Sequence, residues 1–429
     1  MLTGPQPVDS LADYDDVILP ARPLRILLAS YRSHPQVGGQ GVYVRALSRA
    51  LAKLGHAVTV ISGPPYPELD DGVVLERLPS LDLFTCDNAL AAFRPAFLRS
   101  WPDLSEWWLH NTAAFGEPYA FGRRLKSWLE PRRHRFDVVH DNQGLFATLS
   151  HLGVATIATL HHPITIDLEF ALAAEPRWER RMLLRRWHSF LATQARVSRA
   201  LPLVLTVSEA SKRRAMSDFG VAAERLRVSP CGVDHAMFHT APDIARDPDL
   251  VLSTVSADTP LKGLVVLIEA MADVIAQRPS SRLHIVGELR DGPAKDAIAR
   301  LGIGANIVCE GRLSQAALAE RYRRAAVVVT PSLFEGFGLP AAEAMACGAA
   351  VIVTDGGALS EVAGDAGVVV PAGDAPALGG AIARLLASDA LKADLGARAA
   401  VRARERFSWE AHARAAARAY ADVGARAHD

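Results

Sequence analysis

Residues 24–62 read LRILLASYRSHPQVGGQGVYVRALSRALAKLGHAVTVIS, and this stretch decides the fold class. LRILLAS (24–30) and HAVTVIS (56–62) are short apolar runs, while VYVRALSRALAKLG (42–55) between them places its apolar residues at helical spacing. Gly55 is suited to end that helix. A strand, a helix and a strand in this order predict a βαβ unit with a right-handed crossover in a parallel sheet.

The same alternation continues to the end of the chain. A chain of 429 residues is longer than the about 250–300 residues that one hydrophobic core usually supports. Further strands are predicted at 137–141, 155–162, 203–208, 225–230, 250–257, 282–288, 306–311, 326–332, 349–355 and 367–371. The pattern therefore predicts an α/β fold of two successive Rossmann-like parallel-sheet domains with a cleft between them.

The domain boundaries follow from composition. We expect a loose tail over 1–23, an N-terminal domain over 24–238, a linker over 239–249 (HTAPDIARDPD), a C-terminal domain over 250–408 and a helix over 409–429. Packing of this last helix on the N-terminal domain is one of the arrangements open to it. Residues 84–135 are rich in aromatic side chains and are predicted to elaborate the N-terminal domain.

Composition excludes several classes of function. The formal net charge is zero, so there is no global electrostatic reason to expect nucleic acid as a partner. The four cysteines are far apart and predict reduced thiols in a cytoplasmic protein rather than disulfides or a zinc site. The acidic start does not resemble a signal peptide, and no apolar run approaches the roughly 20 residues that span a bilayer.

The strongest chemical signal is TPSLFEGFGLPAAEAMACG (330–348). A buried strand is predicted to end at Thr330, and a glycine-containing loop then leads to a helix with Pro340 near its start. Ligands bind at the carboxyl ends of parallel strands, and a helix N-terminus favours anionic groups. Glu335 and Glu343 can accept hydrogen bonds from sugar hydroxyls at two points, although a glutamate at a helix start can equally be a simple cap.

This string resembles the E-x7-E motif of the family 4 retaining glycosyltransferases, which have the GT-B fold. The resemblance covers nearly the whole chain after residue 23. Its other motifs are SHPQVGGQG, VVHDNQG, TLHHP, VSEASKRR, SPCGVDHAMF, the LKG loop and GALSEV followed by AGVVVPAGD. It implies two domains facing a central cleft that holds a nucleotide-sugar donor.

The resemblance assigns roles to the motif. It implies that Glu335 contacts the transferred sugar, that Glu343 contacts the ribose, and that backbone amides of the loop face sugar and phosphate. The loop residues concerned are Gly336, Phe337, Gly338 and Leu339.

Lys262 precedes a predicted helix in TPLKG and can neutralise a diphosphate as a compact charge, although most lysines are simply solvated. The resemblance places it at the donor diphosphate. The sequence departs from the family just upstream, where Ser256 and Ala257 replace a common Gly-Arg pair. Another arginine, or the hydroxyls of Ser256 and Thr259, would have to compensate.

The N-terminal domain contributes His161, which ends a predicted strand in TLHHP. The resemblance places this histidine beside the reacting sugar and makes it a catalytic candidate with Lys262 and Glu335, although His162 is adjacent. Gly38, Gly39 and Gly41 are expected near the diphosphate, and their simpler role is a strand-to-helix turn.

No metal and no cofactor are predicted. Asp247-Pro248-Asp249 is formally a DxD string, which metal-dependent transferases of another fold use for Mn²⁺, but it falls in the predicted linker. The chain has no GxSxG elbow and no P-loop.

The predicted function is therefore retaining transfer of a hexose from a UDP- or GDP-sugar to an acceptor hydroxyl. The acceptor is open between a sugar, a lipid-linked sugar and a small molecule. A sugar-nucleotide epimerase of similar fold and a donor-binding protein without transfer activity are the alternatives. A dehydrogenase is disfavoured, because no GxGxxG opens the first helix.

Two basic segments, 122–136 and 177–199, bear on localisation. In the second, Leu183, Trp187 and Phe190 would share one face of a helix rich in arginine. Such a helix can pack on the sheet, with solvated arginines, or lie at the inner face of a membrane as a peripheral anchor.

Overall fold

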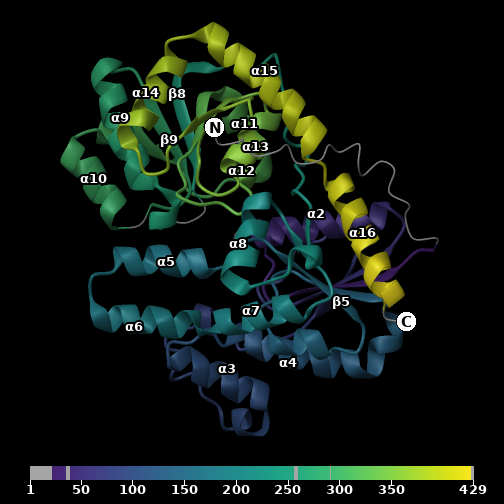
Figure 1. The fold of residues 1–429 in the computed structure, drawn as a ribbon. Helices are drawn as coiled ribbons and strands as arrows, with labels where there is room; N and C mark the ends of the chain where they lie inside the picture. The colour runs from purple at the N-terminus through teal and green to yellow at the C-terminus, as the bar shows by residue number, and fades with distance from the viewer. Residues whose placement is uncertain (1–21, 35–38, 256–258, 290, 427–429) are drawn as a thin grey trace. The chain divides into compact units, whose positions relative to one another are not determined.

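The computed structural model describes residues 22–34, 39–255, 259–289 and 291–426, which form two compact units (Figure 1). The N-terminal unit contains residues 22–207, 211–229 and 409–426, and the C-terminal unit contains 208–210 and 230–408. The linker prediction over 239–249 needs correction, because the division falls at Ser229–Pro230 and the first strand of the C-terminal unit already begins at Asp247.

The N-terminal unit is built on a seven-stranded parallel sheet in the order β3-β2-β1-β4-β5-β6-β7. Its strands are β1 (Arg25–Ser30), β2 (Ala57–Ser62), β3 (Val74–Arg77), β4 (Val138–Asp141), β5 (Ala155–Leu160), β6 (Val204–Thr206) and β7 (Leu226–Val228). β1 pairs with β2 on one side and with β4 on the other. The strand order therefore reverses between β1 and β4, which is where such sheets bind ligands.

Helices cover both faces of this sheet. They are α2 (Gly39–Lys53), α3 (Trp101–Asn111), α4 (Glu117–Leu129), α5 (Thr165–Ala174), α6 (Trp178–Trp187), α7 (Leu191–Ala200), α8 (Glu209–Phe219) and α16 (Trp409–Arg426). α16 packs against α2 and β5 (Figure 1). On the other face, side chains of α4 and α7 join the apolar core beneath the strands.

The basic segment 177–199 is not the single helix that the sequence suggested. α6 ends at Trp187, a 3-10 turn spans His188–Phe190, and α7 begins at Leu191. Trp187 and Phe190 both pack on Phe115, whereas Leu183, one turn before Trp187 on α6, is exposed. Among the described residues, no helix is long and apolar enough to cross a membrane.

The C-terminal unit is built on a six-stranded parallel sheet in the order β10-β9-β8-β11-β12-β13. Its strands are β8 (Asp247–Thr254), β9 (Arg282–Val286), β10 (Ile307–Cys309), β11 (Ala325–Thr330), β12 (Ala350–Thr354) and β13 (Val368–Val370). This is the doubly wound Rossmann order, and its reversal lies between β8 and β11.

The helices of this unit are α9 (Leu264–Gln277), α10 (Pro293–Leu301), α11 (Gln315–Arg324), α12 (Leu339–Ala346), α13 (Leu359–Ala363), α14 (Ala375–Leu386) and α15 (Asp389–Arg406). α9 packs against α10 and α14, and α12 packs against α11, α13 and α15. Figure 1 shows β8 and β9 between these two groups of helices. The strands are continuous apolar runs because both faces of the sheet are buried.

Candidate active site

The C-terminal unit brings Lys262 and Glu335 together at the reversal point of its sheet. Lys262 closes a short turn after β8, and Glu335 lies in the loop after β11. The Lys262 Nζ lies 2.7 Å from Glu335 Oε1, and the Ser332 hydroxyl donates to the same oxygen at 2.7 Å. The carboxylate is thus held by two donors from separate segments, which fixes its direction.

Gly263 explains how these two segments approach so closely. It has φ 65°, and a Cβ at this position would lie 2.0 Å from the carbonyl oxygen of Pro331. The contact is extended by a hydrogen bond from the Leu333 N–H to the Leu261 carbonyl at 2.7 Å. A glycine is therefore required for Lys262 to reach Glu335.

Glu343 lies on α12 and belongs to the same unit, but its environment differs. Although part of its side chain is open to solvent, desolvation raises the pKa of its carboxyl to about 8, which a hydrogen bond from Tyr322 partly offsets. Tyr322 is buried, and its hydroxyl lies 3.1 Å from Thr254 Oγ1 at the end of β8. Glu343 is thereby connected to the reversal point, and near neutral pH its carboxyl is largely protonated.

The loop between Glu335 and α12 offers backbone rather than side chains. Gly336 is buried, and the buried ring of Phe337 packs edge-on against Phe407 at 5.4 Å, so only the main chain of Phe337 is available to a ligand. Gly338 has φ 101°, and a Cβ there would lie 2.6 Å from Leu359 Cδ2. Leu339 is the first residue of α12, so the loop leads into a helix N-terminus.

In the N-terminal unit, His161 directly follows β5, and its Nε2 lies 2.9 Å from Asn142 Oδ1. Desolvation, with smaller contributions from His162 and His412, lowers the pKa of His161 to about 3. The imidazole is therefore neutral. Because an amide oxygen only accepts, Nε2 carries the proton and Nδ1 keeps its lone pair.

Asn142 is a site residue that received no role from the sequence. It follows β4 at the reversal point of the sheet, and its Nδ2 lies 3.4 Å from Ser30 Oγ at the end of β1. The Tyr43 ring packs edge-on against His161 at 4.5 Å, and its hydroxyl bonds Thr159 at 2.8 Å. The signal that could have identified Asn142 is its place directly after a buried strand that pairs with β1.

The structure also defines the positions of His162 and of the predicted glycine Gly41. His162 pairs with Asp167 at 2.9 Å rather than with Asn142, which separates the roles of the adjacent histidines. Gly41 lies in the first turn of α2, where a Cβ would come within 2.5 Å of the His34 carbonyl.

Gly39 begins α2 and is exposed. Gly38 lies outside the described residues, as do Ser256 and Ala257.

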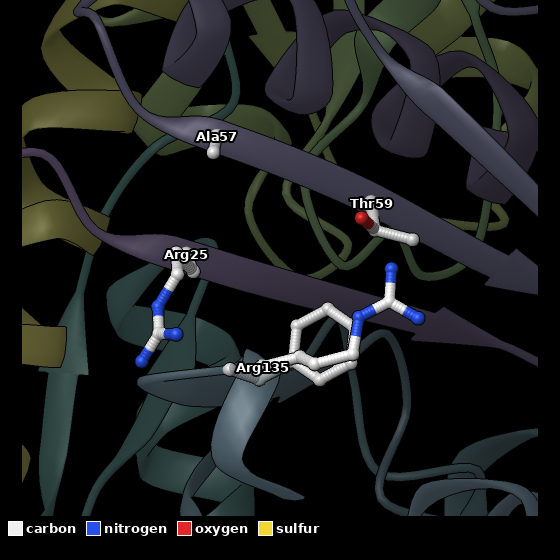
Figure 2. A pocket seen from close by; sticks show the side chains of 5 residues that line it. Arg25, Ala57, Thr59 and Arg135 are labelled. Atoms are coloured by element: carbon white, nitrogen blue, oxygen red, sulfur yellow. The ribbon is translucent and has the colours of Figure 1, made fainter. Parts of the chain in front are cut away.

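Two further features lie at the amino ends of the strands, away from the strand ends that carry His161, Lys262 and Glu335. Figure 2 shows a pocket beside Arg25, Ala57 and Thr59, with Arg135 and Phe136 also lining it. Arg25 and Ala57 open β1 and β2, so the pocket lies at the amino ends of the strands. The Arg25 guanidinium is already bound to Asp137 at 2.9 Å.

The DxD string also lies at an amino end. Asp247 and Asp249 open β8, where Asp247 pairs with Arg282 at 2.6 Å and Asp249 pairs with Arg278. No group of three or more metal-ligating side chains occurs within the described part of the chain. The two aspartates therefore hold arginines on neighbouring elements.

The chain matches two family models in sequence. Residues 37–237 match Glycosyltransferase Family 4, and residues 240–402 match Glycosyl transferases group 1. A curated relative, the MMP alpha-(1->4)-mannosyltransferase of Mycolicibacterium hassiacum, is 44% identical over 396 residues, which cover 90% of this chain and 95% of the relative.

Solved structures resemble the fold. Sucrose-phosphate synthase from Thermosynechococcus elongatus superposes with a TM-score of 0.67 at 23% identity, covering 94% of this chain and 100% of that one. Anabaena HepE in complex with UDP and glucose gives 0.67 at 16% identity, covering 93% and 99%.

Proposed function

The chain belongs to the family 4 glycosyltransferases, and we propose that it transfers mannose from a nucleotide-linked donor to the 4-hydroxyl of an acceptor sugar with retention of configuration. The observation that carries this proposal is 44% identity to an α-(1→4)-mannosyltransferase along nearly the whole of both chains. A linkage of this name joins the anomeric carbon of mannose to oxygen 4 of another sugar, which makes the acceptor a saccharide.

Lys262 and the α12 N-terminus are suited to the departing diphosphate. An ammonium has three donors, and only one is required by Glu335. The other two can bind phosphate oxygens while the Glu335 carboxylate accepts hydrogen bonds from mannose hydroxyls. Charge that develops on the leaving phosphate is then met by a cation already held in place.

We assign Glu343 to the ribose of the nucleotide. A carboxyl whose pKa is raised to about 8 is protonated in part at neutral pH and can both donate and accept hydrogen bonds. Ribose hydroxyls also donate and accept. Tyr322 holds the Glu343 carboxyl in one orientation, so the pair of hydroxyls meets a fixed partner.

His161 suits the neighbourhood of the anomeric carbon because it is neutral. An imidazolium there would oppose an oxocarbenium-like centre, whereas a neutral ring with Nδ1 unprotonated can accept a hydrogen bond from a sugar hydroxyl. In the transfer, the bond from the anomeric carbon to the phosphate oxygen breaks and a bond to the acceptor oxygen forms on the same face. The acceptor proton passes to the leaving phosphate.

We propose that transfer requires no metal ion. Asp247 and Asp249 are committed to Arg282 and Arg278, and Lys262 supplies a positive charge for the diphosphate. Transfer measured before and after dialysis against EDTA is expected to be equal. A rate that collapses with EDTA and returns with Mn²⁺ or Mg²⁺ contradicts this expectation.

We propose a cytoplasmic enzyme that meets anionic lipid through α6. Cys86 and Cys309 carry exposed thiols, which suits a reducing compartment. Trp178, Met182 and Leu183 on α6 are exposed beside arginines. This face is suited to the interface of a membrane, where a lipid-linked acceptor would be found.

The decisive experiment is a donor screen with an α-(1→4)-linked mannotetraose as acceptor. GDP-mannose, UDP-glucose and UDP-galactose are offered separately, and the products are analysed by mass spectrometry and by the one-bond carbon–proton coupling at the anomeric centre in NMR. We expect one added mannose in the α configuration. An inverted product, or transfer from a glucose donor alone, would refute the proposal.

A further inference from the structure

An aromatic cluster in the N-terminal unit has no role in the site described so far. Phe84, Phe115 and Trp187 come from three separate segments: a 3-10 turn (Leu83–Thr85), the loop between α3 and α4, and the end of α6. Phe115 stacks on Trp187 at 5.1 Å, and Phe84 contacts both, at 6.2 Å and 5.9 Å. We call these three rings the aromatic platform. It is only partly buried, and Phe84 is 43% exposed.

The platform is joined to the carboxyl edge of the sheet that carries His161. The Tyr31 ring packs edge-on against Phe115 at 5.7 Å. Tyr31 follows β1 directly, and Ser30 before it donates to the Arg32 carbonyl at 3.0 Å. Because Asn142 links His161 to Ser30, one chain of contacts runs from the neutral histidine to the platform.

Charged side chains with unmet hydrogen-bonding capacity border the platform. The Arg32 guanidinium lies 4.8 Å from the centre of the Phe84 ring, 3.6 Å from Asp82 and 3.4 Å from Glu117. The atoms of these two ion pairs, Arg32 Nη2, Asp82 Oδ1 and Glu117 Oε2, face one another without completing a hydrogen bond. Their hydrogen-bonding capacity is therefore only partly used.

The backbone beside the platform is strained. In the described part of the chain, Asp82 with φ 46° and Ala113 with φ 54° are the two non-glycine residues with positive φ. Each lies two positions before a ring of the platform, Phe84 and Phe115 respectively. Such conformations are unfavourable for residues with a Cβ and concentrate where a ligand is held.

We propose that the aromatic platform, with the partly exposed Arg32 and Asp82 beside it, is a subsite for a sugar ring of the acceptor oligosaccharide. The apolar face of a pyranose packs on an aromatic ring, while its equatorial hydroxyls reach polar groups at the edge of that ring. This arrangement is typical of a ligand site with an aromatic floor and a few placed polar groups. The inference rests on the proposed function, because that function makes the acceptor a saccharide.

The test compares Phe84→Ala and Trp187→Ala with Phe93→Ala. Phe93 is a matched control, since it lies in the same insert, is 38% exposed and packs on Phe97 and Trp107 instead. We expect KM for mannotetraose to rise about tenfold in each platform variant, because each variant loses an aromatic contact and its buried apolar area. Affinity for the nucleoside diphosphate should stay at the wild-type value, and Phe84→Tyr should restore KM.

Melting curves establish that each variant is folded. If the platform variants change KM for the tetraose no more than Phe93→Ala does, the subsite is refuted. If wild-type enzyme transfers nothing to the tetraose, the proposed function fails separately. The subsite is then decided by calorimetric binding of mannotetraose and maltotetraose to the wild type, and binding of neither overturns it.

Discussion

Both parallel sheets have a point at which the strand order reverses, but the side chains at these two points differ in charge. In the N-terminal unit the reversal carries His161, whose neutral ring is held by Asn142. In the C-terminal unit it carries Lys262 and Glu335, a charged pair. The same fold thus supplies neutral hydrogen bonding in one unit and charge in the other.

The side chains packed behind these residues also differ between the two units. Behind His161 runs a buried polar network, in which Thr159 bonds Tyr43 and His140, and Tyr43 and His140 bond His412 and Tyr420 of α16. Behind Glu335 lies an apolar core of aliphatic strand and helix residues. A neutral group needs directional partners to hold its orientation, whereas an ion pair at a loop is oriented by its own charge.

Removing the charge of Glu335 should produce the largest effect. Glu335→Ala loses the proposed acceptor for hydroxyls of the donor sugar and the partner that holds Lys262, so we expect turnover to fall about 10²–10³-fold, as when one transition-state contact is lost. The melting temperature should change little, since the residue lies in a partly exposed loop. Glu320→Ala, which removes an exposed carboxylate paired with Arg324 on α11, is the control. Turnover within a factor of three in a folded Glu335→Ala enzyme would exclude the assigned role.

Lys262→Ala should separate phosphate binding from nucleoside binding. One charge-assisted contact contributes about 1.5–3 kcal/mol, so Kd for the nucleoside diphosphate should rise roughly 10- to 100-fold while Kd for the nucleoside stays constant. Calorimetry with both ligands gives the comparison. Lys295→Ala, on an exposed lysine paired with Asp291, should change neither value. Equal losses for both ligands would place Lys262 away from the diphosphate.

Asn142→Asp should favour the protonated, charged form of His161 in the N-terminal unit. A carboxylate beside Nε2 favours the imidazolium, so the pKa of His161 should rise from about 3 toward or beyond its ordinary value. In the wild type the folded histidine is neutral while the unfolded one protonates below pH about 6.5, so stability is lost as pH falls from there toward 3. The aspartate should reduce this loss and lower turnover about tenfold at pH 6.

The pH dependence of turnover distinguishes protonation of His161 from loss of its hydrogen bond to Asn142. Asn142→Ala removes the same hydrogen bond without adding charge, so it should lower turnover by a similar factor at every pH. Asn142→Asp should lose activity progressively as His161 protonates, and histidine proton NMR should report the same midpoint. Identical profiles for the two variants would show that the charge state of His161 does not matter.

The sequence predicted the pattern of strands because buried parallel strands are continuous apolar runs. All but one of the strands were anticipated, and the exception, β3, is short, polar and at the edge of its sheet, with Val74 55% exposed. Nothing in VLER distinguishes such a strand from a loop. Asp247 and Asp249 were misplaced for a related reason, because the strand that they open begins with polar residues that bind arginines on other elements.

The sequence singled out Lys262 and Glu335 in the C-terminal unit but gave no role to Asn142 in the N-terminal unit. Lys262 and Glu335 were identified from their motifs, and the structure brings them within 2.7 Å. Asn142 was missed because its role depends on the pairing of β4 with β1, which joins residues 112 positions apart. When strand pairing brings two distant residues together, no short sequence motif contains both of them.

The remaining prediction concerns α6 and anionic lipid. Arg181 donates to the backbone carbonyls of Leu172 and Glu175 and so holds the turn before α6, which makes it a poor test residue. Arg180 and Arg185 are exposed on the same helix as Trp178, which is 67% exposed. Each basic residue near an anionic surface contributes about 1 kcal/mol. Co-sedimentation with vesicles rich in phosphatidylserine should therefore exceed that with neutral vesicles and weaken with salt.

The variants decide whether α6 is responsible for that binding. Arg180→Glu with Arg185→Glu should lower the partition coefficient roughly tenfold or more, since two attractive charges become repulsive. Trp178→Ala with Met182→Ala should lower it by a smaller factor through lost apolar burial. The control is Arg300→Glu with Arg324→Glu, two exposed arginines of the C-terminal unit, which should retain binding. If the wild type stays in the supernatant with anionic vesicles at low salt, α6 has no role at a membrane and the acceptor is a soluble saccharide. If both arginine pairs act alike, the attraction is a property of overall charge, and the two units do not differ in this respect.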